Sequence, residues 1–198
     1  MLLIQGGELV FDEEDVELQA ENILITDGGL LQVGTEAVPF QHKAVITLHG
    51  HVRSKELPIY GTKSLIVREG TLDLHGAHVP ITWTKLATSA AVGDKQITLQ
   101  HQVTWQKGDT IVITTTGGIN SQYESETATI TSIAMNRTIT LNSSLTNQHK
   151  GISEFVDGRE LHFSAEVGLL TRNIVIRGFK DSSQETEQVT ACPDGFDT

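Results

Sequence analysis

The sequence predicts an all-β protein, a parallel β-helix (solenoid) that carries an inserted antiparallel β-subdomain. Apolar residues alternate or run in short blocks bounded by Gly, Asp and Asn, which is the pattern of strands, and helical periodicity is almost absent. Four glycines, Gly6, Gly28, Gly50 and Gly70, close such blocks at steps of 22, 22 and 20 residues. After Gly76 this spacing breaks, and shorter alternating strands follow.

The glycine-ended blocks have the spacing of solenoid coils. A repeat of about 20 residues is too short for a propeller blade but suits one coil of a β-solenoid. We therefore expect the last three of these blocks to stack in register, which places Ile46 between Leu24 and Ile66. Segments 30–34 and 71–76 resemble each other and predict a second strand in each coil.

The coil pattern is interrupted and then returns. The segments DKQITLQ, VTWQKGDTIVITTTG, ETATITSI and NRTITLNSSL are short strands joined by polar turns, which predicts an antiparallel barrel or sandwich. The pattern of the first part reappears in AEVGLLTRNIVIRG. The predicted organisation is therefore a single domain, 1–198, with coils at 1–76 and 165–180, an insert at 77–164 and a loop to the next segment at 181–198.

The charge balance excludes some partners. The chain has 25 acidic and 14 basic residues, a formal net charge of −11 at pH 7. Nucleic acids and anionic membranes bind where Lys and Arg cluster, so we expect no nucleic-acid partner and no direct membrane contact. Residues 1–42 contain nine acids and no Lys or Arg. This stretch is either a solvated acidic face or, at residues 12–15, a calcium site, although the spacing of an EF-hand is absent.

Three positions favour an extracellular location. Asn136 and Asn142 each begin an N-x-[ST] sequon, and the two flank a predicted strand whose turns would expose them. The single cysteine, Cys192, is expected to pair with a Cys outside this chain. The alternative is a structural thiol of a cytosolic protein.

Four segments together carry a resemblance to a known family: ILITDGGLLQVG, LIVREGTLDLHG, WQKGDTIVI and AEVGLLTRNIVIRG. In order and spacing they resemble the eight-glycine extracellular domain, over nearly the whole chain. The resemblance implies a right-handed parallel β-helix, an extracellular location and a large multidomain parent. Relatives of the fibrocystin type resemble receptors or surface-coat components of single-pass membrane proteins, whereas relatives of the hyaluronidase type depolymerise hyaluronan.

We favour a non-catalytic structural or recognition module in the ectodomain of a plasma-membrane protein. Its expected partners are the neighbouring domains of the parent, with an extracellular protein or glycan as further candidates. The alternatives are a part of a hyaluronan-cleaving glycosidase and a glycan-binding module. No catalytic motif of the family can be matched residue by residue, so we assign no catalytic residue, cofactor or metal.

Two side-chain groups are candidate sites. The expected register stacks Asp27, His49 and Glu69 as a column at one corner, where two carboxylates would favour the charged form of the imidazole. A basic strip that could attract a polyanion is formed in the sequence by Arg53, Lys55, Lys63 and Arg68.

Other polar and aromatic residues have simpler explanations. His49 and His51 could share one strand face as metal ligands, but zinc needs three or four converging ligands. Asp27, Glu69 and Asp73 could supply the paired carboxylates of glycoside hydrolysis, yet acidic residues are common in turns. We expect Asp109 to bond its own turn, and Trp83 and Trp105 to be core residues rather than sugar platforms.

Overall fold

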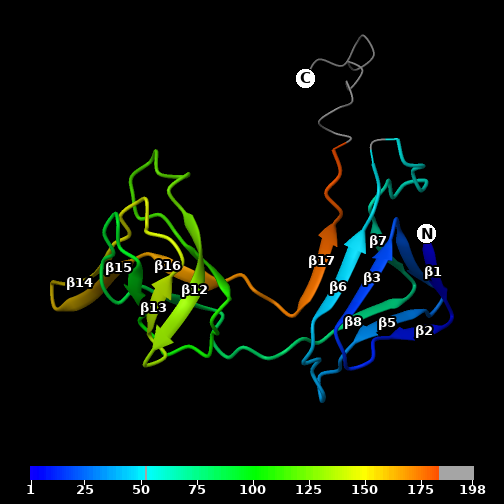
Figure 1. Ribbon diagram of the computed structural model, residues 1–198, viewed down its shortest axis with the longest axis horizontal. Coiled ribbons are helices and arrows are strands. Elements are labelled where there is room, and N and C mark those ends of the chain that lie inside the picture. The colour runs from blue at the N-terminus through cyan, green and yellow to red at the C-terminus, as the bar shows by residue number, and fades with distance from the viewer. Residues whose placement is uncertain (52, 183–198) are drawn as a thin grey trace, which may run out of the picture. The chain divides into compact units, whose positions relative to one another are not determined.

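The computed structural model describes residues 1–51 and 53–182 and consists of strands joined by turns (Figure 1). Its described part contains strands β1 to β17 and no helix, which confirms the all-β class. It also contains no helix of the length and apolarity needed to cross a membrane. The chain divides into two compact units, the first formed by Met1–Ala77 with the chain from Arg172 onward, and the second by His78–Thr171.

The first unit is built from three parallel sheets of three strands each. In each sheet the middle strand is paired on both edges, so its backbone groups are satisfied without a hairpin. The sheets are β1 (Leu2–Gln5), β4 (Ile23–Thr26) and β7 (Leu65–Arg68); β2 (Glu8–Val10), β5 (Leu30–Val33) and β8 (Thr71–Leu74); and β3 (Val16–Ala20), β6 (Ala44–Leu48) and β17 (Ile174–Gly178).

The core of this unit comes from the alternate, inward-facing residues of these strands. Every second residue is buried in β4 and β5, and all five residues are buried in β6. The fully buried side chains are mostly β-branched or aliphatic, as suits stacked parallel strands. They include Ile23, Ile25, Leu31, Val33, Phe40 and Ile46.

The predicted register is wrong for the block at 44–50. Leu24 pairs directly with Ile66, and the two similar segments also pair directly, as β5 with β8. Ile46, however, does not lie between Leu24 and Ile66, because β6 belongs to another sheet and pairs with β3 and β17. A short apolar block that ends in glycine looks the same on every face of such a stack, so its spacing alone cannot assign the face.

The prediction that the chain rejoins the coils at residue 165 is also wrong, because residues 165–171 belong to the second unit. Strand β16 (Glu166–Leu169) pairs antiparallel with strands of the second unit, and only from Arg172 does the chain rejoin the first unit. The inward-outward alternation of β16 fits either a coil or an antiparallel sheet. The predicted loop at 181–198 lies, from residue 183 onward, outside the described residues.

The second unit is an antiparallel sheet with an attached hairpin. The sheet order is β10-β13-β12-β11-β16-β9, and its buried core includes Leu86, Leu99, Trp105, Ile111, Ile130 and Ile139. The strands are β9 (Trp83–Lys85), β10 (Gln96–Thr98), β11 (Thr110–Ile113), β12 (Glu126–Ala134), β13 (Thr138–Leu141) and β16, and the hairpin is β14 (Gly151–Val156) with β15 (Arg159–Ser164).

One glycine of the first unit is required by close packing. A Cβ on Gly29 would overlap with the backbone carbonyl of Ile4 on strand β1, whereas a Cβ on Gly7 would have no atom nearer than 3.9 Å. We therefore expect Gly29→Ala to lower the free energy of unfolding by about 1–3 kcal/mol. Gly7→Ala is the matched control and should change it by less than about 0.5 kcal/mol. Thermal melts followed by circular dichroism compare the two variants, and equal melting temperatures would contradict this packing.

Candidate functional site

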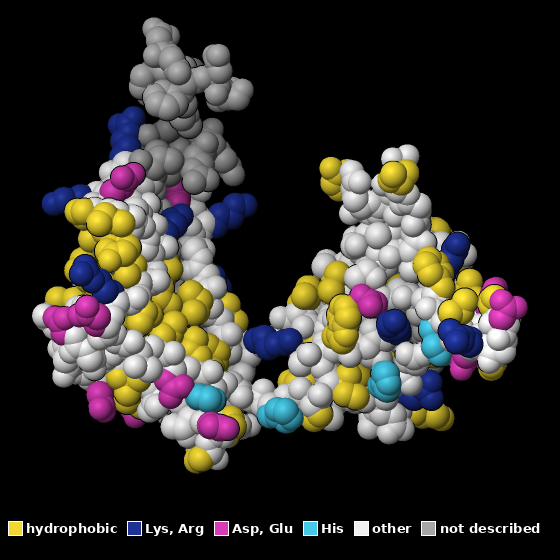
Figure 2. Space-filling view, turned by 180° about the vertical axis from the view of Figure 1, so that it is seen from behind, with side chains coloured by type: hydrophobic (Ala, Val, Ile, Leu, Met, Phe, Trp, Pro, Cys, Tyr) yellow, Lys and Arg dark blue, Asp and Glu magenta, His cyan; other side chains and the backbone are white. Residues whose placement is uncertain are grey.

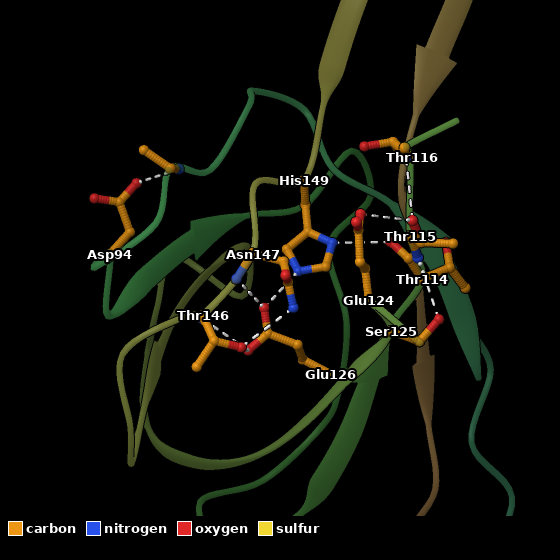
Figure 3. A network of polar contacts seen from close by, with 12 residues as sticks. Asp94, Thr114, Thr115, Thr116, Glu124, Ser125, Glu126, Thr146, Asn147 and His149 are labelled. Carbon is orange, nitrogen blue, oxygen red and sulfur yellow. Dashed lines mark hydrogen bonds and ion pairs between the residues drawn. The ribbon is translucent and has the colours of Figure 1, made fainter. Parts of the chain in front are cut away.

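The second unit contains a buried histidine and a partly buried glutamate that point toward each other (Figure 3). His149 lies just before β14 and is 0% exposed, and Glu126 is the first residue of β12. The His149 Nε2 atom lies 3.0 Å from Glu126 Oε1, and Nδ1 lies 2.9 Å from the carbonyl oxygen of Thr114. Both partner atoms are acceptors, so a ring nitrogen that carries a hydrogen can donate to either of them.

The glutamate also holds the loop between β13 and β14. The backbone N–H and the hydroxyl of Thr146 each donate to Glu126 Oε2 at 2.8 Å, and the Asn147 N–H donates to Oε1 at 2.7 Å. Burial raises the pKa of Glu126, but these hydrogen bonds and that of His149 outweigh it and lower the pKa from 4.5 to about 2. A carboxylate that accepts this many bonds stays ionised and fixes the loop in one position.

Next to this loop the surface is hollowed into a cavity of about 610 Å³, referred to below as the hairpin cavity. Its polar lining comes from the loop at residues 146–148, from Glu124 and from Thr116, and its apolar lining includes the Phe163 ring of β15. The Lys150 Nζ atom lies 5.7 Å from the centre of that ring. A second, smaller hollow of about 270 Å³ shares Lys150 and Phe163 and continues along the hairpin.

Local contacts of the chain shape this cavity. The Lys150 N–H donates to Thr116 Oγ1 at 2.9 Å, which joins the loop to the opposite wall. In the hairpin, Phe163 pairs with Ile152, so both side chains lie on the same face. Gly117 packs against Ser121 and Glu124, with no room for a side chain. The result is a hollow with one aromatic side and one amide-rich side.

The predicted corner column is only partly present. Asp27 and Glu69 follow directly after β4 and β7, which are neighbours in one sheet, and both have a positive φ. His49 follows β6 in a different sheet, so it does not lie between them. It instead contacts Gln19, with its Nε2 atom 3.0 Å from Oε1, and stacks on Phe179 at 4.6 Å between ring centres. Asp27 accepts a hydrogen bond from Gln5 at 2.6 Å.

The four residues of the predicted basic strip have separate surroundings. Arg53, Lys55 and Lys63 lie between β6 and β7, and Arg68 is the last residue of β7. Lys63 forms an ion pair with Asp181 at 2.9 Å and also donates to the Phe179 carbonyl. Its charge is thereby compensated, so Lys63 adds little to a surface that would attract a polyanion.

Two of the acidic residues at 12–15, Glu13 and Asp15, bind backbone N–H groups. Glu13 accepts hydrogen bonds from the N–H groups of Gln41 and His42, and Asp15 accepts one from Lys43 N–H at 2.9 Å. In the part of the chain that the structure describes, no three His, Cys, Asp or Glu side chains are grouped to hold a metal ion. His51 accepts a hydrogen bond from the Arg53 N–H through Nδ1.

Two polar clusters in the first unit lower carboxylate pKa values. A hydrogen bond from Thr47, followed by one from Arg177, lowers the pKa of Glu17. A hydrogen bond from Gln32 lowers the pKa of Asp73, and His75 at 2.8 Å adds to the effect. Both clusters link strands that pair within one sheet, which is a structural role.

The aromatic and turn predictions have mixed outcomes. Trp105 is buried and donates to the Ile81 carbonyl at 2.7 Å, and Asp109 accepts from the Gln106 N–H of its own turn, both as expected. The core assignment of Trp83 is wrong, since this side chain is 57% exposed. Strand β9 lies at the edge of its sheet, where only one face is covered.

The sequons lie at both ends of β13. Asn136 is exposed in the turn after β12, with a positive φ, and Asn142 is exposed directly after β13. The Asn142 side-chain oxygen accepts a hydrogen bond from Thr129 N–H at 2.8 Å. Cys192 lies outside the described residues, so its predicted disulfide stays a prediction.

Sequence reasoning missed the pair of Glu126 and His149, which are 23 residues apart. One signal was available: Glu126 shares the inward face of β12 with Ala128 and Ile130, because side chains alternate along a strand. A carboxylate on an otherwise apolar face needs partners. Nothing in the sequence around His149 names it as that partner.

The amino-acid sequence of this chain is similar to those of known proteins. Residues 1–87 match the family model of the G8 domain, the eight-glycine domain, which confirms the family resemblance for that part. The chain is 60% identical over 200 residues to fibrocystin-L of Homo sapiens and 40% identical over 178 residues to fibrocystin of Mus musculus. It spans 5% and 4% of those proteins, while 100% and 89% of this chain are covered.

Similarity to solved structures is weak. The tailspike gp61 of Pseudomonas phage phi297 covers 75% of this chain and 24% of its own, with 11% identity and a TM-score of 0.39, too low to establish a shared fold. The relatives named above give no support to the expected likeness to the cell-surface hyaluronidase.

Proposed function

We propose that this chain is a non-catalytic structural or recognition module in the extracellular part of a large receptor-like surface protein. The supporting observation is the 60% identity to fibrocystin-L along the entire chain. The matched segment makes up 5% of fibrocystin-L. The proposed partners are the neighbouring domains of such a parent, together with an extracellular ligand.

We also propose a β-helix for the first unit. The three parallel sheets would be successive faces of a short right-handed parallel β-helix, with strands β1, β2 and β3 in one coil and β4, β5 and β6 in the next. Support comes from the shared parallel register of all three sheets. Strands β7, β8 and β17 would form the third coil, into which the antiparallel unit is inserted.

A non-catalytic role is supported by how the carboxylates are used. Asp27 accepts from Gln5, Asp73 accepts from Gln32, and Glu126 accepts from a loop backbone. The alternative of a hyaluronan-cleaving module is tested by incubating the purified chain with size-defined hyaluronan. We expect no shortening of the band on a gel relative to a heat-killed control, and shortening would favour the alternative.

The extracellular part of the proposal has a separate test. When the chain is secreted from mammalian cells, we expect an N-glycan on Asn136 or Asn142, because both sequons are exposed beside turns. Intact mass before and after glycosidase treatment measures it, and the variants Asn136→Gln and Asn142→Gln assign the site. An unchanged mass would remove this support for an extracellular location.

A further inference from the structure

We infer that the hairpin cavity of the second unit is a binding site for a neutral oligosaccharide. This inference deepens the recognition role in the proposed function and rests on it. It rests on three features of the cavity: one exposed aromatic ring, amide and carboxylate groups that can form further hydrogen bonds, and a fixed loop that carries the amides. A cavity of about 610 Å³ is within the range of small-ligand sites, about 300–1,000 Å³.

The aromatic side of the cavity is the ring of Phe163. This side chain is 55% exposed although the ring is large and apolar, and Ile152 lies beside it on the same face of the hairpin. An aromatic face is electron-rich and attracts polarised C–H groups, which a pyranose ring presents on one of its faces. Phe163 therefore offers a platform that suits a sugar ring.

The opposite side of the cavity offers hydrogen-bonding groups in the arrangement that sugar hydroxyls need. The Gln148 side chain is exposed and makes no hydrogen bond to any of the described residues. The Asn147 amide uses its nitrogen to donate to Thr146 and keeps its oxygen as an acceptor. The Glu124 carboxylate has one long contact, 3.5 Å from Thr115 Oγ1. Each hydroxyl of a sugar both donates and accepts, so amide and carboxylate pairs match it.

The charge of the cavity favours a neutral ligand. Its lining contains one basic residue, Lys150, and one acidic residue, Glu124, which offset each other. On the side of the second unit that Figure 2 shows, basic and acidic side chains are interspersed. The whole chain carries −11, so a polyanion would be repelled at longer range.

The amide side is held in place before any ligand binds. Glu126 accepts the backbone N–H groups of Thr146 and Asn147, and its Oε1 atom also contacts the ring of His149 (Figure 3). A ligand therefore need not order this loop, which removes a part of the entropic cost of binding. The smaller hollow that shares Lys150 and Phe163 extends the site along the hairpin, so more than one sugar residue fits.

The test uses the full chain and a panel of neutral trisaccharides of glucose, N-acetylglucosamine, mannose and galactose. Saturation-transfer NMR detects binding, and titration of the protein amide signals measures affinity. We expect at least one trisaccharide to bind, Phe163→Ala to weaken it about tenfold, and Gln148→Ala to weaken it by a smaller factor. Phe163→Tyr keeps the ring and should keep the binding.

The matched control is Phe155→Ala. Phe155 is 76% exposed on the same hairpin but lies on its opposite face, so its removal should leave the affinity unchanged. Absence of binding across the panel, or equal losses in Phe163→Ala and Phe155→Ala, would overturn the inference. The proposed surface-module function would survive that result, because glycosylation and inertness toward hyaluronan are measured separately.

Discussion

Replacing Glu126 by glutamine is expected to lower the free energy of unfolding of the second unit by about 3–5 kcal/mol at neutral pH. The fully buried ring of His149 would then face an amide in place of a carboxylate. In addition, an amide has one acceptor oxygen where the carboxylate has two, so its NH2 group would face either Thr146 N–H or Asn147 N–H. Both tryptophans, Trp83 and Trp105, lie in this unit, so urea unfolding followed by tryptophan fluorescence measures its stability.

Glu154→Gln is the control for this substitution. Glu154 is an exposed carboxylate on β14, and its neutralisation should change the stability by less than about 0.5 kcal/mol. Equal stabilities of the two variants would show that the buried pair contributes no more than a surface charge.

The same pair predicts an acid-sensitive stability. The pKa of Glu126 is lowered from 4.5 to about 2 in the folded chain, so the folded state binds the proton less tightly than the unfolded state. Its contribution is complete above pH 4.5 and is lost as the pH falls to about 2, and it amounts to about 3 kcal/mol. In the Glu126→Gln variant, the fluorescence-detected transition should depend less on pH across this window than in the unaltered chain.

Ile46→Ala is expected to destabilise the first unit by about 2–5 kcal/mol. Ile46 is 0% exposed at the centre of β6, between its register partners Leu18 and Ile176, so the shortened side chain leaves a cavity between packed strands. Thermal unfolding followed by circular dichroism measures the loss.

Val67→Ala is the control for Ile46. Val67 lies on β7 of the same unit and is about half exposed. The substitution also shortens an aliphatic side chain to alanine, but at an exposed position it leaves little cavity. If both substitutions lower the melting temperature equally, Ile46 does not have the core position described above.

The comparison of sequence and structure shows which information is local. The strand segments and the antiparallel insert follow from alternation and turn residues, which depend on near neighbours. The sheet to which β6 belongs does not follow from such local patterns, because it depends on the lengths of the segments that connect the strands. The corner between β2 and β3 spans residues 11–15, whereas the equivalent corner between β5 and β6 spans residues 34–43.

The candidate site was less predictable than the fold. Glu126 meets His149, and Phe163 lies across the cavity from the loop at 146–148, only through tertiary packing. Phe163 looks like any apolar strand residue in the sequence, and its exposure becomes evident only when the hairpin is seen to have no strand beside it.

The sheet formed by β3, β6 and β17 has a consequence for how the chain folds as it is made. The partner residues Ile46 and Ile176 are separated by 130 residues, and the whole of the second unit lies between them. At a synthesis rate of about 5–20 residues per second, one edge of β6 waits roughly 6–26 s for β17 to emerge. An apolar strand with an open edge recruits other chains during such a delay. We therefore expect the closure of β17 onto β6 to be sensitive to chain concentration, and light scattering during refolding should rise with the protein concentration.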